Sequence, residues 1–242
     1  MIFEAADKMK NFEEGIFNIL DDKRKELESQ GRKIYNFSVG TPDFEPEEHI
    51  MKAVSEACLH PENYRYALSD RDELLEAVIR RYKHRYHTDI AKNEIMSVYG
   101  SQEGMTHIFL PLINPGDVVL LPNPGYPIFN TGAFVAQASQ WLYPLTEEND
   151  YLPDLAAIPE DVCRAAKVMV VSYPANPICK TAPDSFYEEL ITFARENEIL
   201  IIHDNAYSDI IYDGREGKSF LAFPGAKEVG VEFYSLSKSY NY

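Results

Sequence analysis

Apolar residues follow two different patterns along the 242-residue chain. Up to about residue 90 they recur at helical spacing among many charged residues, as in residues 12–31 and 70–86. Gly31 is placed to end the first of these helices, and Pro46 to open another that runs to about Leu59. The N-terminal part of the chain is therefore predicted to be helical.

From residue 94 onward the apolar residues form short continuous runs instead. Helix-length stretches, such as 101–113 and 182–198, separate several of these runs. The alternation of strands and helices predicts an α/β fold of three layers, in which helices cover both faces of a mostly parallel sheet. The runs are rich in β-branched residues and have the length of strands. The predicted strands are 94–100, 117–122, 139–145, 167–174, 198–204 and 231–237.

Composition narrows the classes of function. A hydrophobic fraction of 45% is typical of a globular protein. The net charge of −16 argues against nucleic-acid binding and against polybasic membrane contact, because the chain has no surplus of positive charge to neutralise phosphate groups. Three scattered cysteines lack the spacing of metal ligands, so we expect no metal and a reduced compartment. Without a secretory signal or an apolar run near the roughly 20 residues of a membrane span, a cytoplasmic protein is expected.

In a parallel sheet, functional groups gather in the loops after the carboxyl ends of the strands. Here those loops read YGSQEG, PNPGYP, SYPANP, HDNAYSD and SLSKS. Ser101 and Gln102, after Gly100, begin a helix that is either simply capped or binds an anion such as a phosphate. Asp204 either caps a turn or pairs with a protonated ring nitrogen, because a carboxylate at the end of an apolar strand needs a positive partner.

The other strand ends allow two interpretations as well. Asn176, between two prolines, is a turn residue or an amide held in a fixed direction. Tyr126 is an aromatic residue at the edge of the core or a ring that stacks on a flat cofactor, and Tyr207 follows Asp204 on the same side if that segment is helical. Lys238 is a surface residue or a partly buried amine that forms an imine with an aldehyde.

Taken together, these groups are the ones that pyridoxal phosphate requires. They supply an amine for its aldehyde, an acid for its ring nitrogen, donors for its phenolic oxygen, an aromatic ring for its face and hydroxyl groups for its phosphate. Ser235 and Ser237 add hydroxyl donors beside the lysine.

The same motifs carry a family resemblance. VGTPDF, YGSQEGM, NPGYP, YPANP, HDNAYSDI and SLSKSYN occur in one order, with 28 residues from Asn176 to Asp204 and 34 from Asp204 to Lys238. Over about residues 12–241 the chain resembles the class I/II pyridoxal-phosphate-dependent aminotransferases of fold type I, which are similar to aspartate aminotransferase. The resemblance implies amino transfer between an amino acid and a 2-oxo acid. It also implies an N-terminal arm with a remnant of the small domain over residues 1–45, and a cofactor-binding large domain over residues 46–242.

The resemblance also implies a role for each candidate residue. Lys238, Asp204 and Tyr207 correspond to the catalytic groups, and Tyr66 to a tyrosine that reaches the phosphate of a neighbouring subunit in a homodimer. Gly40 and Asn176 correspond to positions near the substrate. The implied cofactor contacts are Ser101, Gln102, Tyr126, Asn176, Asp204, Tyr207, Ser235, Ser237 and Lys238.

The family pattern continues well past the lysine. It includes an arginine that clamps the phosphate, a further strand, and a C-terminal segment of the small domain with an arginine that grips the substrate carboxylate. Residues 239–242 contain none of these, so we expect a truncated and impaired form that lacks the C-terminal small domain. Two alternatives to amino transfer stay open, a pyridoxal-phosphate-dependent β-elimination lyase and a non-catalytic remnant.

Overall fold

The computed structural model describes residues 3–4, 6, 8–9, 12, 15–37, 40–212 and 214–242. The chain divides into two compact units. One consists of Met1–Glu45 with Asn241, and the other of Pro46–Tyr240 with Tyr242. The sheet and both apolar cores belong to the larger unit.

In the smaller unit, the amphipathic pattern of residues 12–31 produces the helix α1 (Ile16–Ser29). The helix ends just before Gly31, whose φ of +79° favours glycine, as the sequence predicted. Arg24 forms ion pairs one turn away in both directions, at 2.6 Å to Asp21 and 2.8 Å to Glu28. The amide of Asn241 donates to the carbonyl oxygen of Phe44 at 2.8 Å.

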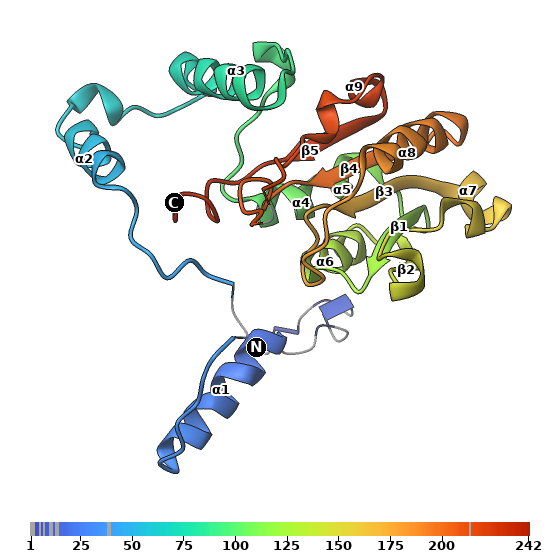
Figure 1. Ribbon diagram of the computed structural model, residues 1–242, viewed down its shortest axis with the longest axis horizontal. Helices are drawn as coiled ribbons and strands as arrows, with labels where there is room; N and C mark the ends of the chain where they lie inside the picture. The colour runs from blue at the N-terminus through green and yellow to red at the C-terminus, as the bar shows by residue number, and fades with distance from the viewer. Residues whose placement is uncertain are drawn as a thin grey trace. The chain divides into compact units, whose positions relative to one another are not determined.

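The larger unit is built on a five-stranded sheet whose strand order is β2-β1-β3-β4-β5 (Figure 1). All four pairs of neighbouring strands are parallel, which confirms the predicted mostly parallel sheet. The strands are β1 (Val118–Asn123), β2 (Ser139–Pro144), β3 (Ala166–Ser172), β4 (Leu200–Asp204) and β5 (Gly230–Phe233).

The prediction of a strand at 94–100 is wrong. A short 3₁₀ helix, η3 (Lys92–Glu94), is followed by residues that belong to no strand. Ser97 bonds to a side chain instead, because its N–H donates to Asp70 Oδ2 at 3.0 Å and its hydroxyl donates to Asp70 Oδ1. A β-branched composition favours a strand only where a neighbouring strand accepts its hydrogen bonds. The last strand is also shorter than predicted, since β5 ends at Phe233.

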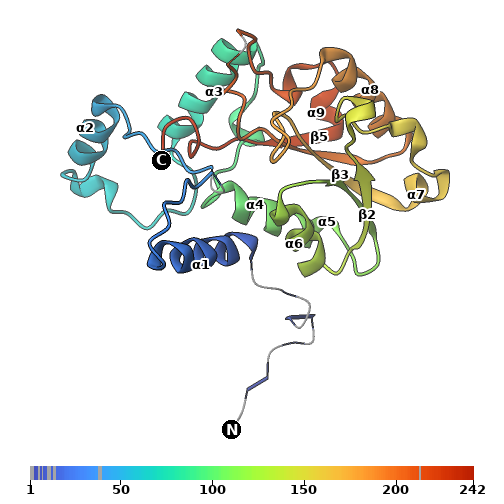
Figure 2. The same cartoon turned by 60° about the horizontal axis from the view of Figure 1, so that its bottom comes forward.

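Helices pack on both faces of the sheet, which gives the predicted three layers (Figure 2). Alternate residues of each strand face opposite cores. Val119, Val170 and Ile202 pack on the side of α4 and α6, and Leu120, Met169 and Ile201 on the side of α8. The helices of the larger unit are α2 (Glu48–Ala57), α3 (Asp72–Tyr86), α4 (Ser101–His107), α5 (Phe109–Leu112), α6 (Pro127–Val135), α7 (Glu160–Ala165), α8 (Asp184–Glu196) and α9 (Ala226–Val229), and its further 3₁₀ helices are η2 (Pro61–Asn63), η4 (Glu147–Asn149), η5 (Leu155–Ala157) and η6 (Phe220–Ala222). Among the described residues, no helix is both long and apolar enough to cross a bilayer.

The carboxylate of Glu232 on β5 lies inside the protein core. The side chains of Glu232 on β5 and His203 on β4 are fully buried, and Glu232 Oε2 lies 2.9 Å from His203 Nδ1 and accepts the Phe220 N–H at 2.8 Å. Its Oε1 accepts the hydroxyls of Tyr82 at 2.7 Å and Ser219 at 2.8 Å. Burial raises the pKa of Glu232, but these donors outweigh it and leave the pKa below its usual value. Glu232 is therefore an ionised carboxylate that joins α3, β4 and the loop before η6.

We expect Glu232→Ala to lower the free energy of unfolding by about 3–5 kcal/mol, because His203 and two hydroxyls lose their common acceptor inside the core. Urea denaturation monitored by circular dichroism measures the change. Glu228→Ala is the matched control, since Glu228 pairs with Arg195 at 3.1 Å but is largely exposed, and we expect it to cost less than about 1 kcal/mol. Equal losses in the two variants would show that the buried carboxylate has no special role.

Candidate functional site

The strand order fixes the position of the candidate site. β2 lies on one side of β1 and the next strand in sequence, β3, lies on the other side, so the winding of the chain reverses between β1 and β3. Ligands of open parallel sheets bind beyond the carboxyl ends of the strands at such a reversal. The segments after β1 and β3 carry Tyr126 and Asn176 to this edge, and β4 ends there at Asp204, three residues before Tyr207.

The turn after β1 determines where Tyr126 lies. A Cβ atom on Gly125 would lie 2.6 Å from the carbonyl oxygen of Pro122, so only glycine allows the chain to turn back so closely. Tyr126 then directly precedes α6, whose first residue is Pro127, as is common at helix starts. The hydroxyl of Tyr126 accepts a hydrogen bond from the side-chain amide of Gln102 on α4.

Asp204 is a buried carboxyl group at this edge. It is 7% exposed, and burial raises its pKa to about 6, although the charge of His203 and a hydrogen bond from Ser172 act in the opposite direction. The Ser172 hydroxyl lies 3.4 Å from Asp204 Oδ2, because the two residues are paired in register on β3 and β4. A carboxylate in this environment favours a cationic partner.

Tyr126 and Tyr207 lie near enough to the Asp204 carboxylate to be affected by its charge. Burial raises the pKa of both Tyr126 and Tyr207, and the charge of Asp204 raises it further in each case. Both hydroxyls therefore stay protonated at neutral pH and can donate hydrogen bonds. The side-chain amide of Asn176 donates to the Tyr207 hydroxyl at 3.5 Å, which joins the loop after β3 to the turn after β4.

Lys238 approaches the same cluster from the segment after β5. Its Nζ lies 5.8 Å from the centroid of the Tyr207 ring. The Ser235 hydroxyl donates to Ser237 Oγ at 2.9 Å and accepts the Ser237 N–H at 3.1 Å, so the two serines shape the turn that leads to the lysine. The structure thus brings together an amine, a buried carboxylate and two aromatic hydroxyls from three segments of the chain.

The remaining predicted residues lie in less enclosed places. Ser101 is the first residue of α4, after Gly100 with its φ of +105°. Tyr66 is 92% exposed, in the segment between η2 and α3. Gly40 belongs to the smaller unit and is exposed.

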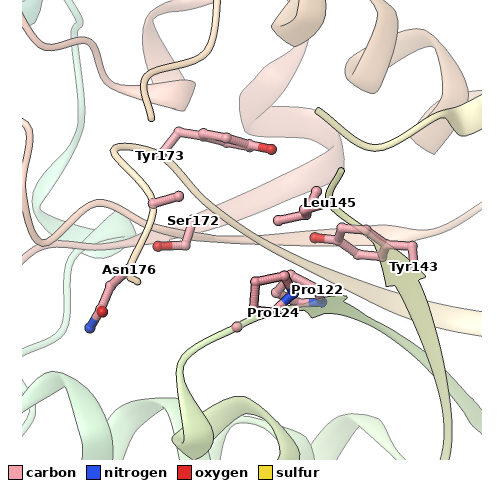
Figure 3. Close-up of a pocket in the computed structure, with 9 residues that line it drawn as sticks. Pro122, Pro124, Tyr143, Leu145, Ser172, Tyr173 and Asn176 are labelled. Carbon is pink, nitrogen blue, oxygen red and sulfur yellow. The ribbon is translucent and has the colours of Figure 1, made fainter. Parts of the chain in front are cut away.

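A small cavity lies beside the cluster (Figure 3). Two of its lining residues contact the site directly, since Ser172 bonds to Asp204 and Asn176 bonds to Tyr207. Ser172 was not among the predicted site residues, although its place near the end of the strand predicted at 167–174 was a usable signal. The cavity is lined by Pro122, Pro124, Gly125, Tyr143, Leu145, Ser172, Tyr173, Ala175 and Asn176.

Comparison with known proteins identifies the family. The sequence pattern of the family described as "Aminotransferase class I and II" matches residues 32–242. The chain belongs to this family. Its members depend on pyridoxal 5′-phosphate, which confirms the predicted cofactor and the predicted resemblance.

The curated relatives are longer than this chain. An LL-diaminopimelate aminotransferase of Aquifex aeolicus is 40% identical over 242 residues, which cover 99% of this chain and 62% of the relative. The same enzyme of Moorella thermoacetica is 40% identical, with 98% of this chain and 62% of the relative covered. The chain therefore spans about 62% of the length of these two relatives.

Solved structures support the fold. BacF of Bacillus subtilis with bound substrate has a TM-score of 0.92 at 37% identity, over 100% of this chain and 61% of that one. A probable N-succinyldiaminopimelate aminotransferase of Thermus thermophilus has a TM-score of 0.87 at 39% identity, over 94% of this chain and 61% of that one.

The residues at the sheet edge fit the cofactor of the family. A pyridine ring that carries a proton needs a carboxylate, and Asp204 is a buried carboxylate whose ionisation is unfavourable without a cation. The aldehyde needs an amine, and Lys238 Nζ lies 5.8 Å from the centroid of the Tyr207 ring. Tyr207 itself follows Asp204 by three residues. The hydroxyl and amide groups of Tyr207 and Asn176 supply donors for an oxygen anion.

We expect Asp204→Asn to stabilise the cofactor-free protein at pH 8 by about 3 kcal/mol, because it removes an unfavourable buried charge. The folded pKa of about 6 exceeds the unfolded value of about 3.9, so the folded state binds the proton more tightly. The charge of Asp204 therefore costs stability progressively between about pH 4 and 6 and fully above that range. The gain of the variant should shrink toward zero as the pH falls to about 4.

Urea denaturation between pH 4 and 8, without cofactor, tests this pH dependence. Asp209→Asn is the control in the same turn, because the pKa of Asp209 lies below its usual value. Its native carboxylate adds stability at neutral pH, so this variant should be less stable there, and its deficit should narrow as the pH falls below about 4. A pH-independent gain for Asp204→Asn would contradict the argument.

Proposed function

We propose that this chain is the cofactor-binding part of an enzyme that transfers an amino group between an amino acid and a 2-oxo acid. The observation that carries the proposal is the carboxylate of Asp204, buried at the end of β4 in one cluster with Tyr207 and Lys238. Family membership supports it. When bound, pyridoxal phosphate supplies an aldehyde for an amine and a ring that withdraws electrons from the amino-acid Cα.

The clustered side chains have distinct proposed roles. The Lys238 amine binds the aldehyde and afterwards holds a proton beside the substrate Cα. Asp204 accepts a hydrogen bond from the ring N–H, and its burial strengthens that bond because little water competes. Tyr207 and Asn176 donate to the phenolic oxygen, and their mutual contact at 3.5 Å orients both groups.

The outer residues bind and orient. We propose that Tyr126 stacks on the ring and that Asn176 approaches the substrate carboxylate. By its match to the family motif, we propose that Gly40 is a backbone position near the substrate. Tyr66 serves the site of a second copy in a homodimer, a role that its 92% exposure allows. Residues 1–45 are an N-terminal arm with a remnant of the small domain, residues 46–242 are the cofactor-binding large domain, and the protein acts in the cytoplasm. The groups proposed to hold the phosphate are Ser101, Gln102, Ser235 and Ser237.

The names of the relatives support a more specific amino donor. Both curated relatives described above are LL-diaminopimelate aminotransferases. We propose LL-diaminopimelate as the first donor to test, with 2-oxoglutarate as an acceptor.

We expect borohydride reduction in the presence of pyridoxal phosphate to fix the cofactor on Lys238. Nζ adds to the aldehyde carbon with loss of water, and hydride then converts the C=N bond to a stable amine. Peptide mapping by mass spectrometry locates the label. Lys238→Ala should abolish it, whereas Lys218→Ala, which removes an exposed lysine paired with Asp184, should not change it. Labelling that is spread over several lysines and survives Lys238→Ala would refute the assignment.

We expect a new amino acid to form from the acceptor when the protein is given LL-diaminopimelate, pyridoxal phosphate and 2-oxoglutarate. Chromatography of the products measures glutamate, with the Aquifex aeolicus relative as positive control. Pyruvate and ammonia from a sulfur amino acid, without glutamate, would favour the lyase. No product from either substrate would favour the non-catalytic remnant.

A further inference from the structure

A second carboxylate lies five residues after Asp204. Oδ2 of Asp209 accepts hydrogen bonds from Arg81 Nη2 at 2.6 Å, from the Tyr234 hydroxyl at 2.7 Å and from the Ser239 hydroxyl at 2.8 Å. Oδ1 lies 3.4 Å from Arg85 Nε. The carboxylate therefore joins α3, the turn after β4 and the segment after β5.

Two of these donors bracket Lys238. Tyr234 precedes the lysine by four residues, and Ser239 follows it directly. Arg81 also contacts residues before and after Lys238. Its Nη1 donates to the Tyr240 hydroxyl at 3.2 Å, and its guanidinium lies 4.5 Å from the centroid of the Tyr234 ring. The ends of the turn that carries Lys238 are thus attached to one ion pair.

The ion pair is enclosed enough to act as a rigid support. The side chains of Arg81 and Asp209 are 23% and 17% exposed. Burial raises the pKa of Asp209, but hydrogen bonds from Tyr234 and Ser239 and the charge of Arg81 outweigh it and keep the pKa below its usual value. Asp209 is therefore charged at neutral pH, and hydrogen bonds to a charged acceptor are stronger than those between neutral groups.

We propose that Asp209 is a positioning residue that fixes segment 234–240 and so directs Lys238 toward Tyr207. The inference rests on the proposed function of Lys238 as the amine that binds the cofactor. A lysine side chain is long and flexible, so the position of Nζ depends on how firmly its backbone is held. Since Asp204 and Asp209 lie in one short segment, the same piece of chain carries the proposed ring partner and the support of the amine.

The test compares the rate of covalent attachment at saturating pyridoxal phosphate. Nζ adds to the aldehyde with loss of water, stopped-flow absorbance follows the reaction, and borohydride trapping with peptide mapping assigns it to Lys238. Asp209→Ala should slow attachment at Lys238 by about 10- to 100-fold, because misplacement of the reacting atom is costly. Attachment at the wild-type rate would overturn the proposal.

Asp117→Asn is the matched control. Asp117 pairs with Lys167 at 2.6 Å and its side chain is 21% exposed, which resembles the Arg81–Asp209 pair, but it directly precedes β1 at the opposite end of the strands. This variant should attach the cofactor within about twofold of the wild-type rate. A slowing as large as that of Asp209→Ala would show a general loss of stability and overturn the positioning role.

Tyr234→Phe carries the test if Asp209→Ala does not fold. It removes one hydrogen bond to Asp209 and keeps the ring under Arg81, so we expect attachment to slow by about fivefold or more. Tyr173→Phe, which removes a hydroxyl bonded to the Tyr151 carbonyl at 2.8 Å, is its control. Equal rates for the two variants would overturn the proposal. Lys238→Ala separates this inference from the proposed function, because labelling unchanged in that variant would refute the function itself.

Discussion

An ionised carboxylate at the buried end of a central parallel strand is unfavourable unless a cation approaches it, and Asp204 occupies that position. Burial raises its pKa to about 6, although the charge of His203, a long hydrogen bond from Ser172 and a backbone hydrogen bond from Ala206 oppose this effect. The same charge raises the pKa of Tyr126 and Tyr207. The candidate site is thus organised around the Asp204 carboxylate, whose buried charge is unfavourable. A protonated ring nitrogen beside it would compensate that charge.

The two aspartates of segment 204–209 show how environment divides similar groups between different tasks. Asp204 is enclosed with few donors, so its proton affinity rises. Asp209 accepts three strong donors on one oxygen, so its proton affinity falls. A carboxylate with unsatisfied capacity is suited to binding a partner, and a satisfied one is suited to holding structure. The two residues lie only five positions apart, so one short segment carries both environments.

The edge strand β5 depends on a buried polar contact as well as on apolar packing. Glu232 receives donors from α3, from the loop before η6 and from His203 on β4. These contacts hold β5 against β4, and β5 leads directly into the segment of Lys238. Polar groups with all their hydrogen bonds made therefore support the strand whose end carries the proposed catalytic amine.

The sequence by itself determined the parallel sheet and most of the candidate site. Apolar runs mark the strands, and in a parallel sheet the residues after them must meet at one edge, so Asp204, Asn176 and Lys238 were predictable without coordinates. Tertiary structure alone decided that residues 94–100 form no strand, because pairing requires a neighbour that composition does not reveal. It also decided the environment of Asp209, since Arg81 lies 128 residues away and no local pattern encodes a contact between separate segments.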